Sequence, residues 1–129
     1  MHIEHIALWT NQREQLKVFY ETYFQAKAGI KYHNPSKHFE SYFLSFSSGV
    51  RLELMYQAKV QEIRPEPMTK NIGYSHLSFA TGSEQGVEAL TNRLHQDGFL
   101  VLNGPRHSGD GYYESVVLDL DGNQIEITV

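Results

Sequence analysis

Two histidines and two glutamates stand at matching places in the two halves of this sequence. His5 and His76 open the alternating segments "HIALW" and "HLSFA", and Glu53 and Glu126 lie within "LELM" and "IEIT". Imidazole nitrogen and carboxylate oxygen are ligands of zinc, nickel, cobalt, iron and manganese ions. One such residue in a strand is ordinarily a solvent-facing side chain. Four at equivalent places favour a site for one divalent metal ion.

The neighbours of these four residues test the idea, because successive side chains of a strand alternate between its two faces. The neighbours on the opposite face are all apolar: Ile6, Leu8, Leu52, Leu54, Leu77, Phe79, Ile125, Ile127 and Val129. The face that carries the candidate ligands also holds a mixture that includes Trp9, Arg51, Ser78 and Gln124. We therefore expect helices to pack on the apolar face and the ligands to line the other, concave face.

Residues 1–56 are expected to form a strand, a helix and three further strands. Apolar residues at helical spacing follow "HIEHIALWT", and the later strand segments are "AGIKYH", "ESYFLSFSS" and "VRLELMY". Asn11 and Glu14 resemble a capping box at the start of the helix, and Gly29 resembles its stop. The predicted order of this module is βαβββ.

The same order is predicted for residues 73–129. "GYSHLSFAT" alternates as a strand, Ser83 can cap the next helix, and Asp97 with Gly98 can end it. Three strands follow, in "FLVLN", "YYESVVLDL" and "NQIEITV". Residues 57–72 carry two prolines and no periodicity, which is typical of a linker. The sequence thus predicts a repeat of about 70 residues.

Composition limits the function classes. A chain of 129 residues fits one domain, or two modules that share a core. The net charge of -4 and the lack of a basic run argue against nucleic acid or a membrane surface as partner. With no cysteine, any metal must be held by nitrogen and oxygen. The expected partner is therefore a small molecule or a second copy of the chain. The pattern contains no signal peptide or membrane span, so a cytoplasmic protein is expected.

The glycine-rich loop near residue 107 and the remaining histidines indicate a function less directly than the four candidate ligands. The loop "GPRHSGDGYY" carries Gly104, Gly109 and Gly111, and it reads equally well as a mobile flap or as a solvated hairpin over 104–111. The remaining histidines lack the symmetry of the repeat and receive no ligand role: His2, His33, His38, His95 and His107.

Five segments are typical of one known family: "HIALWT", "VFYETYF", "RLELM", "GYSHLSFAT" and "SGDGYYESVVLDLDGNQIEI". Through them the chain resembles, over nearly its whole length, the glyoxalase I and vicinal oxygen chelate superfamily (glyoxalase, bleomycin resistance protein, dioxygenase). Departures are Phe24 and Gln25, where many members have Leu-Gly, and Leu120, where proline is common.

The resemblance implies an α+β fold in which two tandem βαβββ modules form an open, curled mixed sheet cup with helices on its outer face. It further implies one divalent metal ion (Ni, Zn, Co, Mn or Fe) held by His5, Glu53, His76 and Glu126, commonly in a homodimer. The implied activity is that of lactoylglutathione lyase, a carbon-sulfur lyase, or a close relative. Such an enzyme converts the hemithioacetal of a 2-oxoaldehyde and a thiol such as glutathione through an enediolate, with Glu126 as the base and Glu53 as its counterpart.

Other members of the superfamily give alternatives. The fosfomycin resistance type uses two histidines and one glutamate, the bleomycin-binding type typically lacks the metal set, and a non-catalytic binding protein is a further alternative. An extradiol dioxygenase fits less well, because it uses two histidines and one carboxylate around iron in a longer chain. Arg13, Arg51, Arg64 and Arg106 are candidates for substrate contact that the sequence does not rank.

Overall fold

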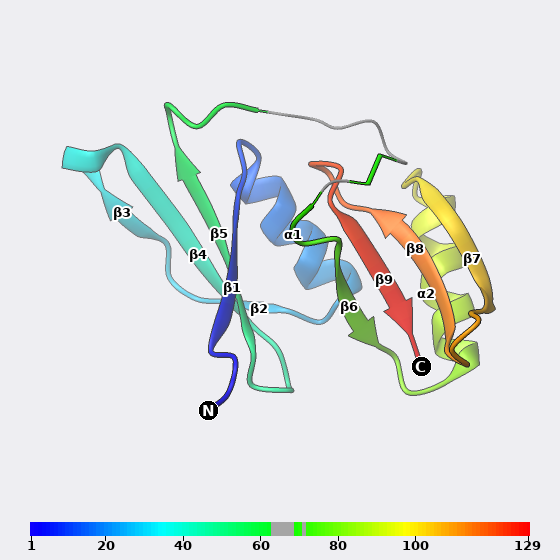
Figure 1. Cartoon of the computed structure of the whole chain (residues 1–129). Coiled ribbons are helices and arrows are strands. Elements are labelled where there is room, and N and C mark those ends of the chain that lie inside the picture. The colour runs from blue at the N-terminus through cyan, green and yellow to red at the C-terminus, as the bar shows by residue number, and fades with distance from the viewer. Residues whose placement is uncertain (63–68, 71) are drawn as a thin grey trace. The chain divides into compact units, whose positions relative to one another are not determined.

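The computed structural model describes residues 1–62, 69, 70 and 72–129. The chain divides into two compact units, Met1–Ile63 and Arg64–Val129 (Figure 1). Part of the predicted linker, residues 63–68 with Arg64 and residue 71, lies outside the described residues. No helix in the described ranges has both the length and the apolar character needed to cross a membrane.

The first unit contains a mixed sheet. Its elements are β1 (His5–Trp9), α1 (Arg13–Tyr23), β2 (Lys27–Ala28), β3 (Tyr32–Asn34), the 3-10 helix η1 (Pro35–Lys37), β4 (Phe39–Ser45) and β5 (Arg51–Gln57). The strand order is β1-β5-β4-β2, and β3 also pairs with β4. The β1–β5 pair is parallel and the other pairs are antiparallel. The single strand expected in "AGIKYH" is thus divided into β2 and β3.

The second unit repeats this plan. Its elements are β6 (His76–Ala80), α2 (Glu84–Gln96), β7 (Val101–His107), β8 (Tyr113–Leu118) and β9 (Gln124–Thr128). The strand order is β6-β9-β8-β7, again with a parallel pair between the first strand and the last. The predicted α+β class and the tandem βαβββ order are therefore confirmed.

Each helix covers one face of its own sheet, as the alternation of apolar residues predicts. Helix α1 packs on β4 and β5, and α2 packs on β7, β8 and β9 (Figure 1). The predicted apolar positions in β5 and β9 are buried: Leu52, Leu54, Ile125 and Ile127. Those of β1 and β6 are half-buried, and Val129 is exposed because it lies beyond the end of β9. Burying one such aliphatic side chain stabilises a fold by about 1.5–3 kcal/mol.

The helix ends differ in how well their signals predict them. Ser83 caps α2 as expected, since its hydroxyl accepts a hydrogen bond from the Gly86 N–H at 3.1 Å. The capping box proposed for Asn11 is wrong. Gln12 is the N-cap residue of α1, and the hydroxyl of Thr10 accepts the Gln12 N–H at 2.9 Å.

The C-terminal end of α1 is also different from the prediction. The helix ends at Tyr23, and Gln25 adopts a left-handed conformation with φ of 56°. Gly29, predicted as the helix stop, instead donates its N–H to the carbonyl of Phe43 in β4 at 2.9 Å. The chain therefore leaves the helix four residues earlier than the glycine suggested.

The predicted loop over 104–111 is shorter in the structure, because β7 continues to His107. Only the turn between β7 and β8 remains, and Ser108 closes it through hydrogen bonds with the backbone of Tyr112 at 3.0 and 3.1 Å. The pairing of β7 with β8 shifts register on both sides of Asn103. The glycine-rich sequence thus marks an irregular strand followed by a turn.

Candidate metal centre

The first unit brings His5 and Glu53 together on one face of its sheet. In the parallel β1–β5 pair, Ala7 lies opposite Glu53 and His5 lies opposite Arg51, so His5 and Glu53 are diagonal neighbours. The Nε2 atom of His5 lies 3.9 Å from Oε2 of Glu53. The glutamate side chain is 13% exposed and the imidazole 39%. The pair therefore has one sheltered and one accessible member.

Three other side chains surround the imidazole of His5. Its Nδ1 atom contacts the carboxylate of Glu4, and the other oxygen of Glu4 contacts the guanidinium of Arg51. Phe43 meets the imidazole in a perpendicular, T-shaped arrangement, with ring centroids 5.3 Å apart, and the Arg51 guanidinium lies 4.2 Å above the same phenyl ring. The hydrogen bond from His5, followed by the interaction with Arg51, lowers the pKa of Glu4.

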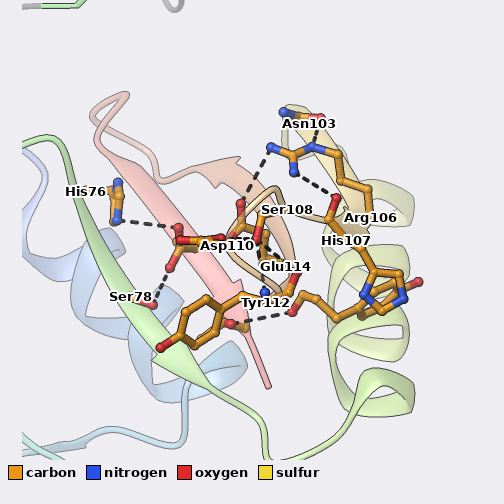
Figure 2. A network of polar contacts seen from close by, with 12 residues as sticks. His76, Ser78, Asn103, Arg106, His107, Ser108, Asp110, Tyr112 and Glu114 are labelled. Carbon is orange, nitrogen blue, oxygen red and sulfur yellow. Dashed lines mark hydrogen bonds and ion pairs between the residues drawn. The ribbon is translucent and has the colours of Figure 1, made fainter.

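The second unit has the same pair in the same register. Ser78 lies opposite Glu126 in the parallel β6–β9 pair, as Ala7 lies opposite Glu53. The Nε2 atom of His76 lies 3.5 Å from Oε2 of Glu126, and Ser78 donates a hydrogen bond of 2.7 Å to Oε1 (Figure 2). The hydroxyl thus holds one oxygen and leaves the other facing the imidazole.

Glu114 of β8 adds a second carboxylate to the polar network of the second unit. Burial, and after it the negative charge of Glu126, raises the pKa of Glu114. Arg106 lies on the other side of Glu114, with Nη2 3.5 Å from Oε1, and its Nε atom donates to Asn103 at 3.1 Å (Figure 2). The network therefore runs from the imidazole of His76 to the bulged strand β7.

Glu114 was missed by the sequence reasoning for a definite reason. It lies opposite Thr128, two residues beyond Glu126 along β9. The equivalent position in the first unit is Ser41, which lies opposite Met55. A search for residues that match between the modules passes over a carboxylate present in only one of them. The signal available was alternation, because Glu114 shares the face of Val116, which lies opposite Glu126.

The structure separates the candidate arginines. Arg13 belongs to the helix-covered side, where its Nε atom pairs with Glu40 at 2.5 Å and its guanidinium lies 4.0 Å from the centroid of the Tyr56 ring. Arg51 instead lies opposite His5 in the β1–β5 pair, and Arg106 lies beside Glu114, the carboxylate next to Glu126. Arg64 falls outside the described residues. Of the candidate arginines in the described residues, Arg51 and Arg106 are thus the ones on the side of the predicted ligands of their own units.

The spacing within each pair is close to that of two ligands on one metal ion. Ligand atoms about 2.1 Å from an ion are roughly 3.0 Å apart at an octahedral angle and roughly 3.4 Å apart at a tetrahedral one. The observed separations are 3.5 and 3.9 Å. Nitrogen and carboxylate donors suit zinc, nickel, cobalt, manganese and iron, and two carboxylates would balance a charge of two. Among the described residues, the histidines and acidic residues form no group of three or more suited to a metal ion, and each unit contains one pair of predicted ligands.

A family model settles the relationship of the chain to known proteins. The model of the Glyoxalase/Bleomycin resistance protein/Dioxygenase superfamily matches residues 2–127. The chain belongs to this superfamily. The resemblance based on the two strand motifs and the C-terminal "DLDGNQIEI" is confirmed.

Similar individual proteins support the fold of this chain and do not establish which reaction it catalyses. The uncharacterized protein YqjT of Bacillus subtilis (strain 168) is 27% identical over 134 residues, covering 97% of this chain and 96% of its own. The structure of a possible glyoxalase from Bacillus cereus has a TM-score of 0.73 at 29% identity, covering 100% of this chain and 99% of that chain. The trypanothione-dependent glyoxalase I of Leishmania major has a TM-score of 0.79 at 19% identity, covering 99% and 86%.

Proposed function

We propose that this protein is a glyoxalase I-like, metal-dependent lyase that isomerises the hemithioacetal of a 2-oxoaldehyde and a thiol. The observation that supports the proposal is the matched pair of ligands, with histidine and glutamate at one register in both units. Each pair supplies two donors, fewer than the three or four protein ligands of a typical zinc site. His5, Glu53, His76 and Glu126 are therefore proposed to bind one divalent ion together.

The two glutamates differ in a way that supports different roles. Ser78 donates a hydrogen bond to Glu126, whereas Ala7, at the equivalent place beside Glu53, has no hydroxyl to donate. Glu126 thus has one oxygen held and one oriented, which is the arrangement a positioned base requires. We assign to Glu126 the removal of the proton from the substrate carbon that bears sulfur and hydroxyl, and its return to the adjacent carbon.

A divalent ion in this site would supply Lewis acidity to two adjacent substrate oxygens and lower the barrier to removal of the carbon-bound proton. Glu53 is proposed as the counterpart of Glu126 on the other side of the substrate. Within the described residues, Arg51 and Arg106 are proposed to bind a charged portion of the thiol. We propose a homodimer as the working assembly, to be measured by light scattering.

The proposal is tested by loading the protein with one metal ion at a time and measuring its enzymatic activity. The metal-free protein is incubated with nickel, zinc, cobalt, manganese or ferrous ions and then supplied with methylglyoxal and glutathione, or with another cellular thiol. Thioester formation is expected with at least one of these ions. Glu126→Gln is expected to lower kcat by at least about a thousandfold, in the range lost with essential catalytic groups, while the metal stays bound.

The control is Glu40→Gln, which removes a carboxylate on the helix-covered side of the first sheet and should leave turnover unchanged. Retention of the metal after replacement of both His5 and His76 by alanine would refute the ligand set. A bound metal without thioester formation from any thiol would refute the lyase assignment and leave the ligand set intact.

A further inference from the structure

The imidazole of His5 is held by a set of contacts that involve more than its proposed metal. Glu4 stands immediately before β1, and its two carboxylate oxygens contact different partners, Nδ1 of His5 and the guanidinium of Arg51. Both partners also contact the ring of Phe43, the imidazole in a perpendicular, T-shaped arrangement and the guanidinium from above. Glu4, His5, Phe43 and Arg51 therefore form a closed cluster, which we call the Glu4 cluster.

This cluster determines which imidazole nitrogen is available. An ionised carboxylate only accepts hydrogen bonds, so Nδ1 of His5 must carry the proton that is donated to Glu4. In the neutral ring the lone pair is then on Nε2, the atom that faces Glu53 at 3.9 Å. The phenyl ring of Phe43, which lies perpendicular to the imidazole at 87°, limits rotation of the imidazole away from this direction.

The second unit does not repeat the cluster. The register pairs His5 with Arg51 in the first unit and His76 with Gln124 in the second. The positions equivalent to Glu4, Arg51 and Phe43 are occupied by Ser75, Gln124 and Val116. The cluster is thus an addition to the first unit and not a consequence of the repeated fold.

We propose that Glu4 is a positioning residue that fixes the tautomer and the direction of His5, and that Arg51 and Phe43 hold Glu4 and His5 in place. This inference rests on the proposed metal site. Partners that accept a hydrogen bond from the second nitrogen of a ligating histidine strengthen metal binding, and their loss typically costs about 10- to 100-fold in affinity. The two histidines of the site consequently differ in how strongly they depend on a neighbouring side chain.

Metal titration of matched variants provides the first test. Ni²⁺ or Zn²⁺ affinity is measured by competition with a chelator for the full-length protein and for Glu4→Ala, Glu4→Gln and Ser75→Ala. Glu4→Ala is expected to weaken binding by about 10- to 100-fold. Glu4→Gln should recover part of this loss because its amide oxygen still accepts the Nδ1–H. Ser75→Ala, the matched change beside His76, should leave the affinity within about twofold. Equal affinity of Glu4→Ala and the unaltered protein would overturn the proposal.

A second measurement needs no metal. Nitrogen NMR of the histidine rings is recorded on the metal-free protein at about pH 8, above the usual imidazole pKa of about 6.5. His5, assigned through His5→Gln, should show the Nδ1–H tautomer, and Glu4→Ala should shift it toward the Nε2–H form while the signals of His76 stay in place. An Nε2–H tautomer for His5 in the unaltered protein would overturn the positioning role. Absence of metal binding by the unaltered protein would instead refute the proposed function, and the NMR result would still decide the role of Glu4.

Discussion

At the scale of single residues, the two proposed ligand pairs share their register but differ in their surroundings. In the first unit the contacts gather on the histidine, through Glu4 and Phe43. In the second unit they gather on the glutamate, because Ser78 donates to Glu126 at 2.7 Å. A repeat that keeps the four proposed ligands and changes their neighbours can therefore give each half of the proposed site a different task.

Ser78→Ala tests this division of tasks. The variant removes the hydroxyl that holds Oε1 of Glu126, and a hydrogen bond to a charged group contributes about 1.5–3 kcal/mol. If about 1.4 kcal/mol of that acts on the transition state, kcat of thioester formation falls by about tenfold. Metal stoichiometry should stay unchanged, since Ser78 is not one of the four proposed ligands.

Ser78→Thr is the control, because it keeps a hydroxyl at the same position and should restore much of the lost kcat. The matched change in the first unit, Ala7→Ser, places a hydroxyl beside Glu53 and should not compensate for Ser78→Ala. A Ser78→Ala protein with full kcat would show that the hydrogen bond to Glu126 does not orient the base.

At the scale of elements, the irregular pairing of β7 with β8 positions Arg106 beside Glu114. The register shifts on both sides of Asn103, and Gly104 has a φ of 82° where the chain passes close to β8. A Cβ atom at this glycine would lie 2.5 Å from the carbonyl oxygen of Glu114 and 2.9 Å from Cα of Ser115. Because both are backbone atoms, a side chain at position 104 could be accommodated only if the backbone of β7 or β8 moved. The close approach thus requires glycine.

Gly104→Ala is therefore expected to destabilise the protein more than its backbone conformation alone predicts. Gly122 offers a matched control, since it has the same φ of 82° and nothing within 4 Å of an added Cβ. Gly122→Ala should cost about 1–2 kcal/mol from the left-handed conformation. Gly104→Ala should cost roughly 1–3 kcal/mol more from the steric overlap.

Urea unfolding of both variants and of the unaltered protein measures the difference in the free energy of unfolding. Equal losses for Gly104→Ala and Gly122→Ala would mean that β7 moves away from β8 without cost. In that case the contact between Arg106 and Glu114 would not depend on the close approach of the two strands.

At the scale of the whole molecule, the sequence correctly predicts which face of a strand is buried, because this depends on the alternation of apolar residues. It does not predict features that depend on a single local contact. Alternating apolar residues in "RLELMY" and "NQIEITV" correctly placed Leu52, Leu54, Ile125 and Ile127 against the helices and Glu53 and Glu126 on the other face. The start of α1 was predicted wrongly because the hydroxyl of Thr10, and not the side chain of Asn11, accepts a backbone hydrogen bond at this end, from the N–H of Gln12. Glu114 was not predicted as a site residue because the equivalent position of the first module is Ser41, which is not a carboxylate.

The two units also allow a test of whether one metal ion is held by ligands from both. If His5, Glu53, His76 and Glu126 bind one ion, saturating metal must stabilise both units at once. At a hundred times the dissociation constant this linkage amounts to about 2.7 kcal/mol, which raises the unfolding temperature of a protein of this size by on the order of 10 °C.

Amide hydrogen exchange measures the stabilisation by bound metal separately for each strand. We expect zinc or nickel to slow exchange in β1 and β5 and equally in β6 and β9, because opening either unit would release two of the four ligands. His76→Ala should then abolish the protection of β1 and β5 although His76 belongs to the other unit, and His5→Ala should abolish that of β6 and β9. Protection that stays in one unit after loss of the other unit's histidine would mean that two donors suffice, and the four-ligand site would be wrong.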